Sequence, residues 1–267
     1  MISRLARLFR LPVAAMNGMA ALGGYCLFPA PRGVGAMLAA FGGVTLLAMG
    51  GTALNQVLER DMDALMTRTR LRPLPRGEMT TAAATAIGCA VIMAGCAVLF
   101  TIGATLPVLL GLVALAWYLA IYTPLKRRTP LALPLGALCG TVPPLVGWCL
   151  AGGDPTDFRI TTLAGLFFIW QIPHFWLLQQ RHADDYRRAG MPLLAIRPGL
   201  LRLWLVALAA TALMLPAFGL IGFYGACWFG LFLSILLMVA LCRCERPLFT
   251  CLNIFPALVT LTLFVRV

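Results

Sequence analysis

The chain has 267 residues, of which 61% are hydrophobic and only 11% are charged, and its formal net charge is +12 at pH 7. A soluble domain carries about 25% charged residues, so this composition excludes a soluble enzyme, a disordered chain and a disulfide-stapled secreted module. The long runs of Leu, Ala, Gly and Val are unlike the alternating strands of a membrane β-barrel, and they predict membrane-spanning helices.

Nine apolar runs are long enough to span a membrane, since a spanning helix needs about 20 residues. Taken in chain order, they cover residues 11–30, 34–56, 80–101, 104–122, 131–151, 160–180, 200–221, 223–241 and 248–265. Because only short connections separate them, we expect residues 1–267 to form a single all-α integral-membrane domain, a polytopic bundle of about nine helices.

Basic residues gather in alternate connections of this predicted bundle. Of the 21 Lys and Arg residues, 18 precede the first helix or follow an even-numbered one, and the exceptions are Arg32, Arg159 and Arg266. The positive-inside rule then places the N-terminus and these connections on the cytoplasmic side of the membrane. We expect that membrane to be a bacterial cytoplasmic (inner) membrane. The net charge is explained by this topology and by attraction to anionic lipid or substrate, and no nucleic-acid partner is expected.

An acidic cluster follows the second predicted helix, where the positive-inside rule requires no acids. If that helix continues, Asn55, Glu59 and Asp63 are spaced i, i+4, i+8 and line one face. Amide and carboxylate oxygens are the hard ligands that Mg²⁺ prefers. Arg68 and Arg72, just downstream, supply bidentate donors for phosphate. The alternative is a solvated helix end whose charges pair among themselves.

A second acidic cluster follows the sixth predicted helix. Gln180 and Asp184 are four residues apart, Asp185 follows Arg181 at the same spacing, and Tyr186 adds a hydroxyl group. We expect the two clusters to face each other across the cytoplasmic mouth of the bundle. Such a mouth suits a diphosphate held through Mg²⁺, above an apolar cavity that accepts a hydrocarbon tail.

The fourth and fifth predicted helices add further candidates. Tyr122 is either an interfacial belt residue or a ring that stacks near a cation in the cavity. Lys126 and Arg127 follow it, and at least one of the basic residues here serves as a positive-inside anchor. Pro143 and Pro144 break the hydrogen-bond ladder of the fifth helix, which is tolerated where a helix packs in protein or lines a cavity.

Several of these motifs together resemble the UbiA superfamily of membrane prenyltransferases, and within it the protoheme IX farnesyltransferase branch. The resemblance covers roughly residues 10–197 and rests on the segments 55–77, 122–130, 143–148, 173–176 and 185–192. Two features depart from the family pattern. Glu59 stands where the first motif usually has Asp, and the second motif offers Asp184 and Asp185 instead of the Asp-x-x-x-Asp seen in members of the quinone branch.

The resemblance implies Mg²⁺-dependent transfer of a farnesyl group from farnesyl diphosphate to a vinyl group of heme b, which is a substrate and not a cofactor. Water then completes a hydroxyethylfarnesyl side chain. The implied catalytic and metal-binding residues are Asn55, Glu59, Asp63 and Asp185. The implied substrate-binding residues are Arg68, Arg72, Tyr122, Lys126, Arg127, His174, Asp184 and Tyr186.

Other interpretations stay open on the sequence. His174 is either a hydrogen-bonded interior residue or a group that ligates heme iron or orients the porphyrin. The acceptor is heme b or another ring such as 4-hydroxybenzoate or a chlorophyll-type ring. The implied partners are the lipid bilayer and a heme A synthase or oxidase-assembly protein. An anion transporter is the alternative class, but it should show inverted repeats and charge at the midplane, whereas these acids lie at one membrane face.

Overall fold

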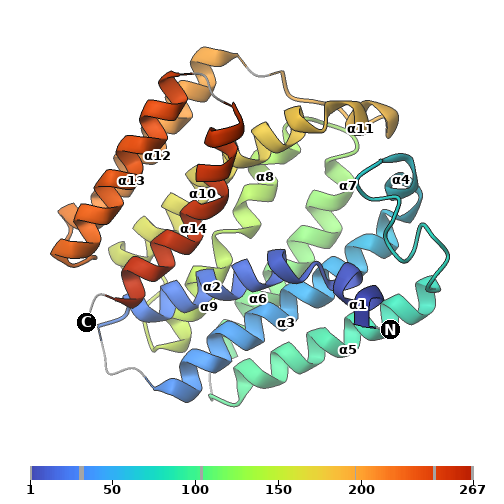
Figure 1. Cartoon of the computed structure of the whole chain (residues 1–267). Coiled ribbons are helices and arrows are strands. Elements are labelled where there is room, and N and C mark those ends of the chain that lie inside the picture. Colours follow the sequence, from blue (N-terminus) through green and yellow to red (C-terminus); the bar gives the residue numbers. More distant parts are fainter. Residues whose placement is uncertain (1, 30–32, 103–104, 196, 243–244, 266–267) are drawn as a thin grey trace.

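The computed structural model is an all-helical bundle (Figure 1) and describes residues 2–29, 33–102, 105–195, 197–242 and 245–265. Within these residues, eight helical segments are long and apolar enough to cross a membrane. They are α3 (Val34–Leu58), α5 (Thr81–Phe100), α6 with η1 and α7 (Thr105–Leu125), α8 with α9 (Ala132–Leu150), α10 (Phe158–Arg181), α12 (Pro198–Ala217), α13 (Phe223–Leu241) and α14 (Glu245–Phe264). A shorter apolar helix, α2 (Leu11–Leu27), has 17 residues.

Each predicted apolar run coincides with one of these segments, so the expectation of an all-α multi-pass membrane bundle is confirmed. The first helix ends earlier than predicted, at Leu27. Three short helices lie outside the spans: α1 (Ile2–Phe9), α4 (Arg60–Leu65) and α11 (Ala183–Arg188).

Prolines interrupt two of the spans. In η1 (Trp117–Tyr122) the Thr123 N–H donates to the Tyr118 carbonyl, five residues back, because Pro124 has no N–H to continue the normal pattern. The other span is divided into α8 (Ala132–Cys139) and α9 (Val142–Leu150). Pro143 and Pro144 cannot donate to the carbonyls four residues before them, so the helix breaks there. Both interruptions place irregular backbone inside the bundle.

Glycines let the central helices approach closely. A Cβ atom at Gly147 of α9 would lie 1.8 Å from the carbonyl oxygen of Ala21, and one at Gly24 of α2 would lie 1.9 Å from that of Pro144. Neither position has room for a larger side chain. Small residues have this role in membrane bundles, where backbone contact and van der Waals packing hold helices together. The α2–α9 crossing forms part of the wall described below.

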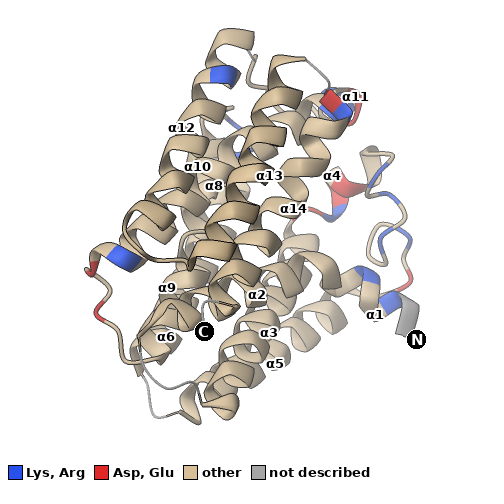
Figure 2. Cartoon of the chain, turned by 60° about the vertical axis from the view of Figure 1, so that its left-hand side comes forward, with Lys and Arg blue, Asp and Glu red and all other residues tan. Residues whose placement is uncertain are grey.

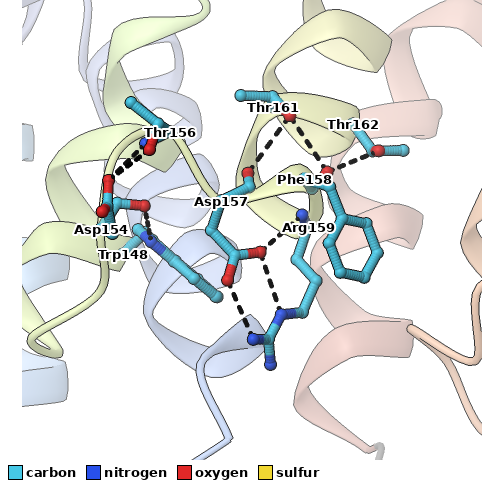
Figure 3. Close-up of polar contacts among 8 residues, drawn as sticks. All are labelled: Trp148, Asp154, Thr156, Asp157, Phe158, Arg159, Thr161 and Thr162. Carbon is cyan, nitrogen blue, oxygen red and sulfur yellow. Dashed lines mark hydrogen bonds and ion pairs between the residues drawn. The ribbon is translucent and has the colours of Figure 1, made fainter.

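Charged residues gather at the end of the bundle where α1, α4 and α11 lie (Figure 2). A smaller charged group lies in the connection between α9 and α10, at the other end. Figure 3 shows that its side chains bond within their own turn. The Trp148 indole donates to the Asp154 carbonyl over 2.8 Å, and Asp157 caps α10 and pairs with Arg159 over 2.9 Å. The hydrogen bonds from Arg159 lower the pKa of Asp157, which keeps this pair charged.

Candidate active site

A cavity of about 590 Å³ extends from the α4 end into the bundle. This volume lies within the range of small-molecule sites, roughly 300–1,000 Å³. Residues from α2, α3, α4, α6, η1, α8, α9, α10, α11 and α14 form its wall, together with residues of the connections that follow α1, α3, α4, α7, α8 and α11. It therefore brings together the segments that the sequence motifs identified.

One wall of the cavity carries Asn55, Glu59 and Asp63, whose exposed fractions are only 3%, 7% and 4%. The helix does not run on straight to Asp63, because α3 ends at Leu58 and Glu59 separates it from α4. Two backbone bonds nevertheless continue the helical pattern: Glu59 donates to the Asn55 carbonyl, and Asp63 donates to the Glu59 carbonyl. The three side chains therefore line the same cavity, as the i, i+4, i+8 spacing predicts.

Both buried carboxylates are paired with cations. Lys126 Nζ lies 2.8 Å from Glu59, and an Arg72 guanidinium nitrogen lies 2.6 Å from Asp63. Burial raises the pKa of Asp63 although Arg72 opposes the shift, and burial lowers the pKa of Lys126 although Glu59 opposes that shift. Since an unpaired buried charge is costly, these two pairs hold the connections after α4 and α7 against the cavity wall.

Asn55 differs from the carboxylates because its amide nitrogen is engaged. That nitrogen donates to the Thr123 hydroxyl over 3.0 Å, and this hydroxyl in turn donates to the Tyr118 carbonyl over 2.8 Å. The amide is thus oriented by η1, and its oxygen remains available as a ligand. An amide oxygen and two carboxylates form a donor set suited to Mg²⁺, which usually takes one or two carboxylates and completes its shell with water and phosphate oxygens.

The described residues contain no group of three or more His, Cys, Asp or Glu side chains that could hold a metal ion. The donor set above has only two such members, so the finding agrees with the geometry. It also means that the set is incomplete for any metal that needs an all-protein cage. A ligand bringing its own oxygen atoms would complete it.

Cations outnumber carboxylates on the part of the cavity wall that the structure describes. Arg10, Arg68, Arg72 and Lys126 line it, against Glu59 and Asp63. Such a surplus of positive charge attracts a polyanion. In the sequence, Arg10 is one of the basic residues before the first predicted helix and carries only a topology signal. It lies between α1 and α2 with a backbone φ of 46°, and the helix restart at Leu11-Pro12 was the only local clue.

Aromatic rings line the deeper part of the cavity. Tyr118 and Tyr122 stack with their ring centroids 5.8 Å apart, and Lys126 Nζ lies 5.2 Å from the Tyr122 ring. Tyr122 therefore lies in the cavity beside a cation, not in an interfacial belt. These π faces are suited to shielding a positively charged centre from water.

His174 lies between two further aromatic rings of the cavity wall. Its ring stacks on Trp170 at 5.0 Å and on Phe249 at 5.5 Å, and all three residues line the cavity. Its Nδ1 atom is buried and has no hydrogen-bond partner among the described residues. The geometry therefore does not support the interpretation of His174 as a hydrogen-bonded interior residue.

The second acidic cluster does not face the first across this cavity. Asp185 is 5% exposed, and its carboxylate accepts hydrogen bonds from the Thr67 N–H at 2.9 Å, from the Arg68 N–H at 3.1 Å and from Arg188. Asp184 is exposed and pairs with Arg187 over 2.9 Å. Both line a separate, more open hollow of about 400 Å³, so Asp185 ties down the arginine-bearing connection after α4.

The hydrogen bonds explain the ionisation of Asp185. Burial alone would raise the pKa of its carboxyl group, but the bonds from Thr67, Arg68 and Arg188 outweigh burial and lower it. Asp185 is thus held as a carboxylate already occupied by donors. Its predicted place as a metal ligand finds no support in these contacts.

Of two other predicted site residues, one lines the main cavity and the other does not. Tyr186 reaches the main cavity, and burial raises its pKa, so the phenol keeps its proton. Arg127 is exposed, does not line the cavity, and donates to the Leu58 carbonyl at the end of α3. Its position is that of an anchor for the helix end, which leaves Lys126 as the residue of this pair that faces the carboxylates.

Sequence reasoning missed Gln171 as well as Arg10. Gln171 lies on α10 one turn before His174, and its side chain lines the cavity. A glutamine in an apolar helix is a weak signal by itself, because only packing decides whether it faces lipid, protein or a cavity.

Comparison with known proteins agrees with this architecture. A sequence model of the UbiA prenyltransferase family matches residues 12–250. A protoheme IX farnesyltransferase of Geobacter sulfurreducens is 56% identical over 265 residues, which is 97% of this chain and 97% of that protein. Another, of Oleidesulfovibrio alaskensis, is 37% identical over 82% of this chain and 79% of that protein.

Solved structures show the same fold. A UbiA homologue from Aeropyrum pernix K1 aligns over 96% of this chain and 98% of its own, with a TM-score of 0.76 and 21% identity. A UbiA homologue from Archaeoglobus fulgidus, bound to GPP and Mg²⁺, aligns over 98% of each chain with a TM-score of 0.69 and 13% identity. With the family model covering most of its length, this chain belongs to the UbiA prenyltransferase family.

Proposed function

We propose that this protein transfers a farnesyl group from farnesyl diphosphate to a vinyl group of heme b (protoheme IX), giving heme O, in a Mg²⁺-dependent reaction. The observation that carries the proposal is one cavity that joins a buried oxygen-donor wall and surplus cations to an aromatic interior. The 56% identity to a protoheme IX farnesyltransferase over nearly the whole chain supports the choice of acceptor.

Asn55, Glu59 and Asp63 would hold Mg²⁺ together with oxygen atoms of the substrate diphosphate. When bound, the metal ion neutralises the negative charge that develops on the leaving diphosphate. Lys126 and Arg72 now neutralise Glu59 and Asp63. With the carboxylates engaged in holding the metal ion, Lys126 and Arg72 would be free to pair with phosphate oxygens, together with Arg10 and Arg68.

Ionisation leaves an allylic cation on the farnesyl group, and the cavity residues protect it. Tyr118 and Tyr122 offer their π faces next to the cationic end. The porphyrin would lie against the stacked rings of Trp170, His174 and Phe249, where a flat aromatic acceptor finds parallel surfaces. The apolar wall keeps bulk water from the cation.

We place the cavity mouth at the cytoplasmic side of a bacterial inner membrane, with the N-terminus in the cytoplasm. The support is the concentration of Lys and Arg at the α1, α4 and α11 end of the bundle (Figure 2). A heme A synthase or oxidase-assembly protein as partner, and the absence of a nucleic-acid partner, stay predictions.

Membranes from a host that lacks heme O, but expresses this chain, should convert heme b and farnesyl diphosphate to heme O when Mg²⁺ is present. Mass spectrometry of the extracted porphyrins checks this outcome, with 4-hydroxybenzoate as the competing acceptor. Prenylated 4-hydroxybenzoate without heme O would favour the other acceptor class. Anion uptake into vesicles without any prenylated product would favour a transporter.

Replacing Asp63 with Asn should lower the rate by about 10²–10³-fold, because a charged group that stabilises the transition state is lost. The rate is measured while Mg²⁺ is titrated, and the Mg²⁺ requirement should rise. Asp61→Asn is the matched control, since Asp61 is an exposed carboxylate on the same short helix and does not line the cavity. An equal loss in the control would refute a specific role for Asp63.

Replacing Asp185 with Asn should raise the KM for farnesyl diphosphate by about tenfold, as expected for the loss of charge-assisted bonds to the Thr67 and Arg68 amides. The Mg²⁺ concentration for half-maximal rate should stay near the wild-type value. A shift in that concentration as large as that of Asp63→Asn would instead support Asp185 as a metal ligand.

Replacing His174 with Ala should weaken heme b binding, because the stack between Trp170 and Phe249 loses its central ring. Absorption spectroscopy of the purified protein titrated with heme b measures the affinity, and a change in the Soret band would also report iron ligation. His182→Ala is the control, since His182 lies in the other hollow. Unchanged affinity in His174→Ala removes the role.

A further inference from the structure

The aromatic part of the cavity contains a buried polar residue, Gln171, to which the reaction above gives no role. Gln171 is only 6% exposed and lines the cavity. Among the described residues, its side-chain amide makes no hydrogen bond, yet its polar atoms are not sealed from the cavity. A buried amide without a partner costs free energy, so a ligand of the cavity is the group that would satisfy it.

The surroundings of Gln171 add oxygen atoms to this position. The amide rests on Gly140, where a Cβ atom would lie 1.4 Å from Nε2 of Gln171. Gly140 belongs to the break between α8 and α9, and it lines the cavity with Cys139. Because Pro143 and Pro144 have no N–H, the carbonyls of Cys139 and Gly140 receive no helical hydrogen bond from them. The Gln171 amide and the helix break at Gly140 thus meet at one place on the cavity wall, which we call the polar notch.

The notch lies near the reacting end of the cavity. Tyr122 rests on Gly136, where a Cβ atom would lie 2.4 Å from its ring, just as Gln171 rests on Gly140. Gly136 lies on α8 and Gly140 directly follows its last residue, so the two glycines are four residues apart, which corresponds to about 6 Å along a helix. The Gln171 amide and the ring of Tyr122, which lies beside Lys126, therefore contact positions one helical turn apart on the same stretch of backbone.

We propose that Gln171 positions the water molecule whose oxygen becomes the hydroxyl group of the product. This inference rests on the proposed function, because only an acceptor with a vinyl group needs such a water. A water molecule needs two to four polar partners, and the notch offers the amide and backbone carbonyls in an otherwise apolar wall.

The reaction breaks one bond in farnesyl diphosphate and forms one carbon–carbon bond and one carbon–oxygen bond in the product. The C1–O bond of farnesyl diphosphate breaks and the diphosphate oxygen keeps the electron pair. The π electrons of the vinyl group form the new bond from its terminal carbon to C1, which leaves a cation on the carbon next to the porphyrin. A lone pair of the water oxygen forms a bond to that carbon, and one water proton passes to the released diphosphate.

Without a positioned water, the same cation has another outcome. It loses a proton from the neighbouring carbon and gives an alkene that is lighter than the hydroxylated product by one water. The ratio of alkene to hydroxylated product therefore reports on Gln171. Because both products come from the same folded enzyme, their ratio does not change when less of a variant folds.

The test compares product ratios by mass spectrometry in wild type, Gln171→Leu, Gly140→Ala and Asn17→Leu, each in membranes with heme b, farnesyl diphosphate and heavy-oxygen water. Gly140→Ala keeps the glutamine but displaces its amide. Asn17→Leu is the control, since Asn17 also lines the cavity but its amide already donates to the Val13 carbonyl over 2.8 Å.

We expect the ratio of alkene to hydroxylated product to rise about tenfold in Gln171→Leu and in Gly140→Ala, which is the effect expected from the loss of one hydrogen bond. In Asn17→Leu this ratio should stay at the wild-type value. Heavy oxygen should appear in the wild-type product. An unchanged ratio in Gln171→Leu or Gly140→Ala, or an equal rise in the control, overturns the inference. If the wild type yields no farnesylated porphyrin at all, the proposed function itself fails.

Discussion

Two carboxylates buried at one end of an apolar bundle set the main constraint on this structure. Glu59 and Asp63 cannot stay charged there without partners, and Lys126 and Arg72 provide them at 2.8 Å and 2.6 Å. Each pair joins a residue at the start of α4 or within α4 to a residue of a connecting segment. The mouth of the cavity is therefore held together by the same charges that we propose act on the substrate, so binding can exchange partners without leaving a charge unpaired.

Irregular backbone marks the cavity. A lipid-exposed helix must satisfy all its backbone groups internally, so interruptions within a membrane bundle belong where protein or a cavity adjoins them. The interruption at Glu59, the π-helical segment η1 and the break after Cys139 all adjoin the cavity. Two of these three interruptions occur where prolines lack the N–H that would continue the helical pattern.

The two acidic clusters look alike in the chain but have different surroundings. Asp63 lies on the cavity wall with one arginine partner, whereas Asp185 is surrounded by the amides of Thr67 and Arg68 and by Arg188. The two carboxylates are nevertheless linked structurally, because Asp185 holds the connection that carries Arg68 and Arg72, and Arg72 pairs with Asp63. A carboxylate can thus serve an anionic site indirectly, by fixing the backbone next to its cations.

The sequence by itself determined the helical membrane class, the positions of the spans and the register of Asn55, Glu59 and Asp63. These follow from local properties, namely the length of apolar runs and the helical period, and both act within one segment. Tertiary structure alone decided which polar groups share the cavity. It brought Arg10 and Gln171 into the wall, directed Asp185 to backbone amides and left Arg127 outside, because contacts between distant segments depend on packing that no spacing in the chain encodes.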